Sequence, residues 1–272
     1  MIKSALRLFA ITFIVYSFVY PFINQHTTPT PPPETSPIIE DVVVPVVVEQ
    51  PKHDVALPDF ASIVDIKAKK SEFFDFIRPH VVDQNKRIEQ QRAVLQIAVM
   101  MLQFDEDLSE QQHRKISKIF KEYKIKDTVT LDSLNRALVR VDIVPEELVL
   151  MQAANESAWG TSRFARIGLN FFGQWCYKQG CGLVPRGRNE GASHEVAVYQ
   201  SVQQAVAAYF RNLNTNRAYA TLRQLRAEAR ENNLQPSAVA LANGLHAYSE
   251  RGQHYVEEIS AMIESNQEYF SE

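Results

Sequence analysis

The sequence predicts a mainly helical domain with a small β lobe, an α+β fold that follows a membrane-directed segment and an extended linker. From residue 59 onward, apolar residues recur at helical spacing almost without interruption. Between about residues 170 and 200 glycine becomes frequent, and the stretch ends in the strand-like EVAVY. Before residue 59 an apolar run is followed by a proline-rich stretch. We therefore divide the chain into residues 1–23, 24–58, 59–143 and 144–272.

The overall composition is that of a folded protein without a nucleic-acid partner. The chain has 272 residues, of which 45% are hydrophobic and 22% charged, enough to bury a sizeable core. A net charge of −3 and the lack of a basic run exclude nucleic-acid binding. The seven histidines show no HExxH and no paired ligand spacing. We expect a monomer with no metal and no cofactor.

The N-terminal segment predicts export. Lys3 and Arg7 precede an apolar run over residues 8–23, which as a helix would span about 24 Å, short of the roughly 30 Å of a bilayer's hydrocarbon core. No small-residue cleavage site follows the run, which favours an uncleaved anchor over a cleaved signal peptide. The positive flank predicts that this end stays inside while the rest is translocated.

Residues 24–58 read as a linker, because proline recurs every few positions and no helical or strand period is sustained. Proline-rich chain extends by about 3.1 Å per residue. A linker of this length would hold a domain up to about 100 Å from the membrane.

Residues 59–143 predict a series of helices. Apolar residues keep helical spacing before Pro79, at Phe73, Phe74 and Ile77, and again from Ile88 onward. Ser109 with Gln112 predicts a capping box for the next helix, and a further helix carries leucines 131, 134 and 138.

Residues 144–272 predict a helix from Pro145 to Glu156, the glycine-rich lobe, and then four more helices. Pro145 suits the first helical position. Ser201 with Gln204 predicts the cap of the first helix after the lobe. Glu156 is therefore expected in the last turn of its helix.

Glu156 stands out because two effects disfavour its ionisation. The helix C-terminus carries negative partial charge, and Trp159 is expected to shield the carboxyl from water. A glutamic acid that keeps its proton near neutrality can protonate a departing glycosidic oxygen. The alternative is an exposed surface glutamate beside a core tryptophan.

Cys176 and Cys181 lie close together in the glycine-rich stretch. After export into an oxidising compartment, a disulfide is the favoured interpretation. A metal site would need two more ligands, and a catalytic thiol would need a histidine partner that the sequence does not place.

Four stretches together resemble the glucosaminidase family of peptidoglycan hydrolases, which includes bacterial autolysins. They are NESAWGTSRFA, NFFGQW, VYQSVQQAVAAYFRNLNTNRAYATLR and YSERGQHY, and the resemblance extends from about Leu57 to the C-terminus. It implies a lysozyme-like fold, mostly helical with a small β lobe beside the cleft.

The resemblance also implies the site residues. Glu156 matches the catalytic acid of the family's Glu-Ser-x-Trp-Gly motif, with Ala158 where glycine is usual. An Asn-x-Phe-Gly element that lines the cleft and a cleft tyrosine match four further positions: Asn170, Phe172, Gly173 and Tyr248. Trp175 and Tyr255, within the same motifs, are expected to contact the substrate as well.

The catalytic base stays open. Some relatives carry a glutamate in the β lobe, and this chain offers Glu190 and Glu195 without a clear positional match. Three mechanisms are compatible: inversion with one of these carboxylates as base, assistance by the substrate's own 2-acetamido group, or water held by a polar side chain such as Tyr248. We rank the acetamido route first because it needs no second carboxylate.

The sequence therefore predicts a peptidoglycan hydrolase on the periplasmic face of the inner membrane, or free in the periplasm if the signal is cleaved. It would cleave the β-1,4 bond of N-acetylglucosamine, as an endo-β-N-acetylglucosaminidase. Two alternatives remain: a lytic transglycosylase, and a catalytically silent protein that only binds the wall.

Overall fold

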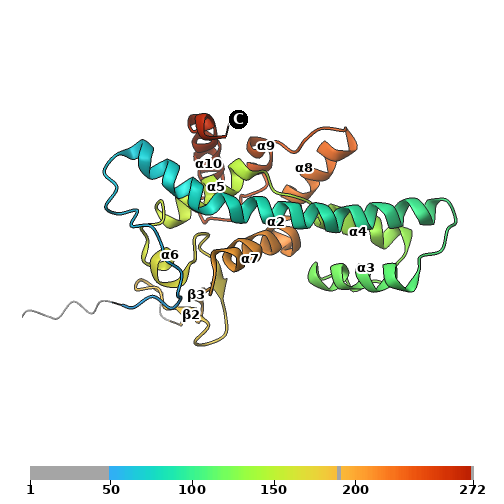
Figure 1. The fold of residues 1–272 in the computed structure, drawn as a ribbon, viewed down its shortest axis with the longest axis horizontal. Coiled ribbons are helices and arrows are strands. Elements are labelled where there is room, and N and C mark those ends of the chain that lie inside the picture. Colours follow the sequence, from blue (N-terminus) through green and yellow to red (C-terminus); the bar gives the residue numbers. More distant parts are fainter. Residues whose placement is uncertain (1–48, 189–190, 271–272) are drawn as a thin grey trace, which may run out of the picture. The chain divides into compact units, whose positions relative to one another are not determined.

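The computed structural model describes residues 49–188 and 191–270, and residues 49–272 form one compact unit (Figure 1). The predicted anchor, residues 1–23, and most of the predicted linker lie outside the described residues. Within the described part, no helix is both long enough and apolar enough to cross a bilayer. Residues 49–58 have neither helix nor strand and hydrogen-bond to the body, with the Lys52 amide donating to the Ile167 carbonyl at 2.8 Å.

One long helix, α2 (Ile66–Gln103), crosses the body (Figure 1). The helical spacing predicted on both sides of Pro79 belongs to this one helix, because Pro79 lies inside α2. Proline cannot donate to the carbonyl four residues earlier, at a cost of about 3 kcal/mol. The helix continues because its inner face is buried on both sides of the proline. The buried apolar residues of this face are Phe73, Phe74, Ile77, Val81, Ile88, Leu95 and Ala98.

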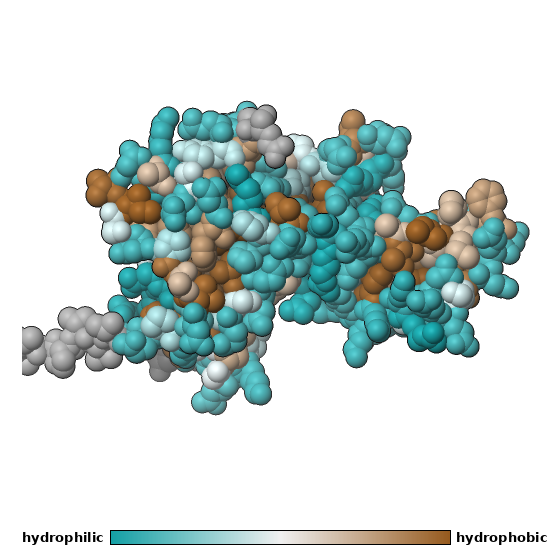
Figure 2. All heavy atoms as spheres, in the orientation of Figure 1, coloured by the Kyte–Doolittle hydropathy of each residue, from teal (hydrophilic) through white to brown (hydrophobic). Residues whose placement is uncertain are grey.

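Two capped helices pack against α2: α3 (Glu110–Glu122) and α4 (Leu131–Arg140). The capping box at Ser109 and Gln112 is confirmed, and α4 has a second one at Thr130 and Ser133. Apolar side chains also gather at the surface where α2 ends near α3 (Figure 2). The large exposed apolar residues in this part of α2 and just after it are Ile97, Met100 and Phe104.

The central helix is α5 (Glu146–Ser157), in contact with α2, α9 (Ala238–Ala242) and α10 (Gln253–Ser265). Residues Leu148 to Ala154 are all buried, so no face of this stretch meets water. Three successive residues with left-handed backbone end the helix: Ala158 at φ 49°, Trp159 at 57° and Gly160 at 78°. A Cβ at Gly160 would clash with the Phe60 ring, so glycine is required there.

The glycine-rich stretch forms the expected small β lobe. After α6 (Arg163–Gly168), three short strands pair antiparallel in the order β1-β3-β2: β1 (Trp175–Cys176), β2 (Gly182–Leu183) and β3 (Glu195–Ala197). Trp175 faces Val196 in the first pair, and Leu183 faces Val196 in the second. The predicted disulfide between Cys176 and Cys181 is confirmed, with Cα atoms 6.3 Å apart.

The remaining helices return to the body. They are α7 (Val202–Thr215), the 3-10 helix η1 (Arg217–Tyr219), α8 (Ala220–Glu231), α9, α10 and the 3-10 helix η2 (Gln267–Tyr269). Ser201 caps α7 as expected, by accepting from the Gln204 amide. Both α5 and α7 contact α2, so the predicted N-terminal helical region and the segment after residue 144 share one core.

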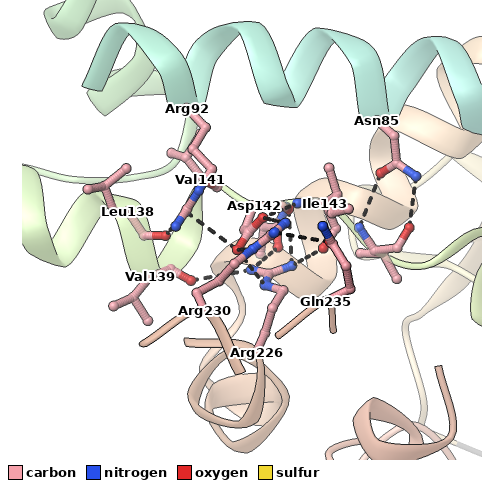
Figure 3. A network of polar contacts seen from close by, with 12 residues as sticks. Asn85, Arg92, Leu138, Val139, Val141, Asp142, Ile143, Arg226, Arg230 and Gln235 are labelled. Carbon is pink, nitrogen blue, oxygen red and sulfur yellow. Dashed lines mark hydrogen bonds and ion pairs between the residues drawn. The ribbon is translucent and has the colours of Figure 1, made fainter. Parts of the chain in front are cut away.

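A buried polar network fixes the loop between α4 and α5 (Figure 3). Arg226 of α8 is fully buried and donates to the carbonyls of Asp142 and Ile143 at 3.0 and 2.7 Å. Its other nitrogen donates to the Asn214 side chain at 2.8 Å. Arg92 of α2 donates to the carbonyls of Leu138 and Val141. The carbonyls at the C-terminus of α4 thus find their partners on α2 and α8.

Asp142 is the countercharge of this network, which we call the Asp142 network: Asp142, Arg92, Arg226 and Arg230. Its side chain is 2% exposed, and Arg230 donates to both of its oxygens, at 3.0 and 3.2 Å. Arg92 and Arg226 lie 3.4 and 3.9 Å from the same carboxylate. Burial lowers the pKa of Arg226 to about 10, and Asp142 opposes that shift.

We predict that Asp142→Ala destabilises the protein by about 3–5 kcal/mol, because three arginines would lose their buried countercharge. Urea unfolding followed by circular dichroism measures this. The control is Asp132→Ala, which removes a 77% exposed partner of Arg136 and should change stability by about 0.5 kcal/mol or less. Equal destabilisation by the two substitutions would contradict the importance of the network.

Candidate active site

Glu156 lies in the last turn of α5, one residue before the helix ends, and its side chain is partly buried. The next residues turn sharply through the left-handed region, so the chain leaves the helix at once. This places the carboxyl at the C-terminal end of a helix that is otherwise buried, as the sequence predicts.

Burial raises the pKa of four tyrosines, and the charge of Glu156 adds to the rise in each: Tyr209, Tyr219, Tyr248 and Tyr255. We call them the tyrosine cluster. Their rings contact one another: Tyr248 stacks on Tyr255 at 5.5 Å and meets Tyr219 at 5.9 Å and Tyr209 at 6.4 Å. They come from α7, η1, the segment before α10, and α10.

The pKa of Glu156 is raised above its ordinary value, chiefly because burial disfavours the charged form. A hydrogen bond from Tyr255, the positive charge of Arg251 and a hydrogen bond from Asn155 oppose that shift, while the negative charge of Glu258 adds to it. The predicted tendency to keep the proton thus has its cause in the structure. Such a carboxyl is suited to general acid catalysis.

The ring of Trp159, which was expected to shield the carboxyl, packs against α2. Trp159 turns toward α2, where its ring meets Phe73 at 5.7 Å and Phe74 at 5.4 Å and Lys70 lies over it. Its left-handed backbone directs it there. The tyrosine cluster adds a second set of aromatic rings whose pKa values respond to the Glu156 charge.

One side of the carboxyl faces open space at Gly173. A Cβ at that position would lie 3.4 Å from Glu156 Oε2 and would meet no other atom within 4 Å. Gly173 has φ of 62°, which favours glycine. The motif glycine thus lies beside the motif glutamate, as the resemblance implies, and leaves room for a ligand to approach the acid.

Asn170 and Phe172 hold the turn at Gly173 from inside the protein, and their side chains are buried. Asn170 is 1% exposed; its amide donates to the carbonyls of Gln174 and Ala197, and its oxygen accepts from the amides of Phe172 and Gln174. Phe172 is also 1% exposed and stacks on Tyr209 at 4.3 Å. Both side chains are thus engaged inside the protein, where they hold the backbone of the turn.

Tyr248 and Tyr255 are also held by the protein. The Tyr248 hydroxyl donates to the Phe172 carbonyl at 2.7 Å, and burial raises its pKa well above the ordinary value, so it stays neutral. Tyr255, predicted to contact substrate, is fully buried and hydrogen-bonds to Gln152 and Glu156. Its place is behind the acid, with no exposed surface to offer a sugar.

Trp175 lies in the β lobe, as predicted, and is 54% exposed. Its ring stacks on His194 at 3.9 Å, nearly parallel, which holds an aromatic face at the surface of the lobe. Exposed aromatic faces of this kind suit carbohydrate rings.

Of the two lobe glutamates, Glu190 lies outside the described residues. Glu195 is 6% exposed and accepts from the amides of Gly180 and Gly182, at 2.9 and 2.7 Å. These two bonds lower its pKa. Both oxygens thus hold the loop that the disulfide closes. This contact gives Glu195 a structural role in the lobe.

Sequence reasoning missed Gln152, Tyr209 and Tyr219. Gln152 sits one helical turn before Glu156, on the same face of α5, and this spacing was the available signal. The two tyrosines lie in the quoted stretch after the lobe, but only the fold brings them to the acid.

Comparison with known proteins decides the family. The model of the glucosaminidase family, described as mannosyl-glycoprotein endo-beta-N-acetylglucosaminidase, matches residues 132–268, about half of the chain. This chain belongs to the glucosaminidase family. Within that family of glycan-cleaving hydrolases it is similar to protein bax of Escherichia coli strain K12, 34% identical over 214 residues, which cover 78% of this chain and 75% of that protein. The sequence stretches quoted above predict this likeness to Bax, and the comparison confirms it. No solved structure matches this glucosaminidase-family chain significantly.

The lowered pKa of Glu195 predicts a pH dependence of the β lobe. A carboxylate whose folded pKa lies below its unfolded value stabilises the fold above the unfolded value, near 4.5, and that contribution is lost as the pH falls through the folded pKa. Hydrogen-exchange protection of the Gly180 and Gly182 amides should therefore fall in that acid range. In Glu195→Gln the change with pH should disappear; an unaltered profile would contradict the assignment.

Proposed function

We propose that this protein hydrolyses the β-1,4 bond of N-acetylglucosamine in the glycan strands of bacterial peptidoglycan, with Glu156 as the general acid. The observation that carries the proposal is the partly buried Glu156 carboxyl, whose pKa is raised and whose Oε2 faces the open side at Gly173. The family supports a glycan as substrate.

In the proposed reaction, Glu156 gives its proton to the glycosidic oxygen as the C–O bond breaks. The carboxylate that forms is stabilised by the Tyr255 hydroxyl and by the charge of Arg251. The substrate's 2-acetamido oxygen bonds to the anomeric carbon as that C–O bond breaks, and the leaving sugar departs with the proton from Glu156. Water then adds to the anomeric carbon, displaces the acetamido oxygen and returns a proton to the Glu156 carboxylate. Trp175 offers an exposed ring on the lobe for stacking on a sugar.

The engagement of Glu195 supports the route through the 2-acetamido group. The two backbone N–H bonds to Glu195 lower its pKa, and a lowered pKa makes the carboxylate a weaker base toward water. Tyr248 is likewise used by the Phe172 carbonyl. The substrate's own acetamido oxygen needs no further protein carboxylate.

We further propose that the protein acts outside the cytoplasm, on the periplasmic side, held by the apolar segment 8–23. The Cys176–Cys181 disulfide supports export, because such bonds persist in oxidising compartments. An anchored enzyme needs reach to a polymer that cannot diffuse to it, and the proline-rich residues support that reading.

Digestion of purified peptidoglycan tests the function. After borohydride reduction, wild type should yield new glucosaminitol ends, and Glu156→Gln should lower their rate of formation by at least a factor of about 100, because the acid is lost. Glu257→Gln, an exposed α10 position, is the matched control and should retain activity. Anhydromuramyl ends would indicate a lytic transglycosylase instead, and wall binding without new ends would indicate a binding protein.

Changing both lobe carboxylates tests the mechanism. We expect the double variant of Glu190→Gln and Glu195→Gln to keep at least about a tenth of the wild-type rate, because the acetamido route does not use them. A loss as deep as that of Glu156→Gln would assign the base to the lobe. Circular dichroism separates loss of chemistry from loss of the fold.

A further inference from the structure

A buried chain of polar side chains lies behind Glu156. The Tyr209 hydroxyl donates to Gln152 Oε1 at 2.6 Å, and Gln152 Nε2 donates to the Tyr255 hydroxyl oxygen at 2.8 Å. The Tyr255 hydroxyl lies close enough to the Glu156 carboxyl to lower the pKa of that carboxyl as a hydrogen-bond donor. Tyr209, Gln152 and Tyr255 are all 0% exposed, so water does not compete for these groups.

The hydrogen bonds of this series all point the same way, from Tyr209 toward Glu156, because each side chain has a limited set of donors and acceptors. A tyrosine hydroxyl has one hydrogen to donate. The Tyr255 oxygen already accepts from Gln152, so its single hydrogen is available for Glu156. Tyr209 can only be the donor to Gln152 Oε1, and that bond holds the amide so that its NH₂ points at Tyr255.

We infer that Gln152 is a positioning residue that fixes the direction of the Tyr255–Glu156 hydrogen bond, so that the tyrosine donates and the glutamate accepts. If the amide were turned over, its oxygen would face Tyr255 and would take the tyrosine's hydrogen. Glu156 would then lose its buried donor. The inference rests on the proposed function for its role in catalysis, but the direction of the bond does not.

This direction matters for an acid that must release its proton. Burial alone would make Glu156 a weak acid, because the carboxylate that forms would be poorly solvated. A donor that is already aimed at the carboxylate stabilises the product of proton transfer without reorganisation. Gln152 thereby sets how far burial can raise the pKa of Glu156.

The other charged and titratable groups around Glu156 are known and stay unchanged in the test. They are Arg251 and Tyr248 before α10, Glu258 on α10, Tyr209 on α7 and Tyr219 on η1. Of these groups, only Tyr209 forms a hydrogen bond with the Gln152 side chain in the part of the chain that the structure describes.

A double-mutant cycle on the full chain tests the inference. Glutamate is labelled with ¹³C at the side-chain carboxyl, and the Glu156 signal is assigned by its loss in Glu156→Gln. The signal is then titrated in wild type, Gln152→Met, Tyr255→Phe and the double variant. We expect both single substitutions to raise the pKa of Glu156, and Gln152→Met to add nothing in the Tyr255→Phe background.

The matched controls lie on α2 and α3. Tyr123 donates to Gln91 at 2.9 Å in a pair of the same kind, and no interaction links it to Glu156. Tyr123→Phe and Gln91→Met should leave the Glu156 titration unchanged. If Gln152→Met does not fold, Tyr209→Phe, which frees the amide to turn, should raise the pKa in the same direction.

Two results would overturn the inference: an unchanged Glu156 titration in Gln152→Met, or the same change in both Tyr255 backgrounds. The titration needs no turnover, so it separates this inference from the proposed function. If the protein also cleaves glycan, the alkaline limb of its pH–rate profile should move to higher pH in Gln152→Met and Tyr255→Phe, and kcat should fall about tenfold in Tyr255→Phe.

Discussion

The position of α5 depends on the buried ion pairs of Asp142. This one carboxylate holds three arginines from two helices, and those arginines hold the carbonyls that end α4. The chain enters α5 directly afterwards, at Pro145. A helix that starts from a fixed point and is buried along its length delivers its last turn to a fixed place. The Asp142 network at one end of α5 therefore determines where Glu156 lies at the other end.

The fold was largely predictable, because most of its helices and strands have local sequence signals. The capping box at Ser109, the serine cap at Ser201 and the helical spacing of apolar residues are short-range signals, and they predict α3 and α7 correctly. The continuation of α2 through Pro79 could not be predicted locally. Proline weakens a helix through its own neighbours, whereas the burial that holds α2 together depends on distant parts of the chain. The fully buried arginine Arg226 could not be foreseen either, because its partners are carbonyls more than eighty residues away in sequence.

The candidate site was predictable in its acid but not in its surroundings. Glu156 and Gly173 come from motifs and do lie side by side. Asn170 and Phe172 come from the same motifs, yet they support the turn from inside. A motif records which residues a site requires, without separating those that meet a ligand from those that hold the backbone. The tyrosine cluster lay beyond prediction, because α7, η1 and α10 meet at Glu156 only after folding.

The attachment of residues 49–53 has a mechanical consequence. Glu49 pairs with Arg163, Lys52 donates to the Ile167 carbonyl, and His53 bonds to the Arg166 carbonyl, all on α6. Any tension that reaches residue 49 from the N-terminal side is therefore borne first by these few contacts on one short helix. These contacts would break one after another, and the freed residues would extend before the force reached α2 and the core. A pull from the N-terminal side would therefore load these contacts before it reached Glu156.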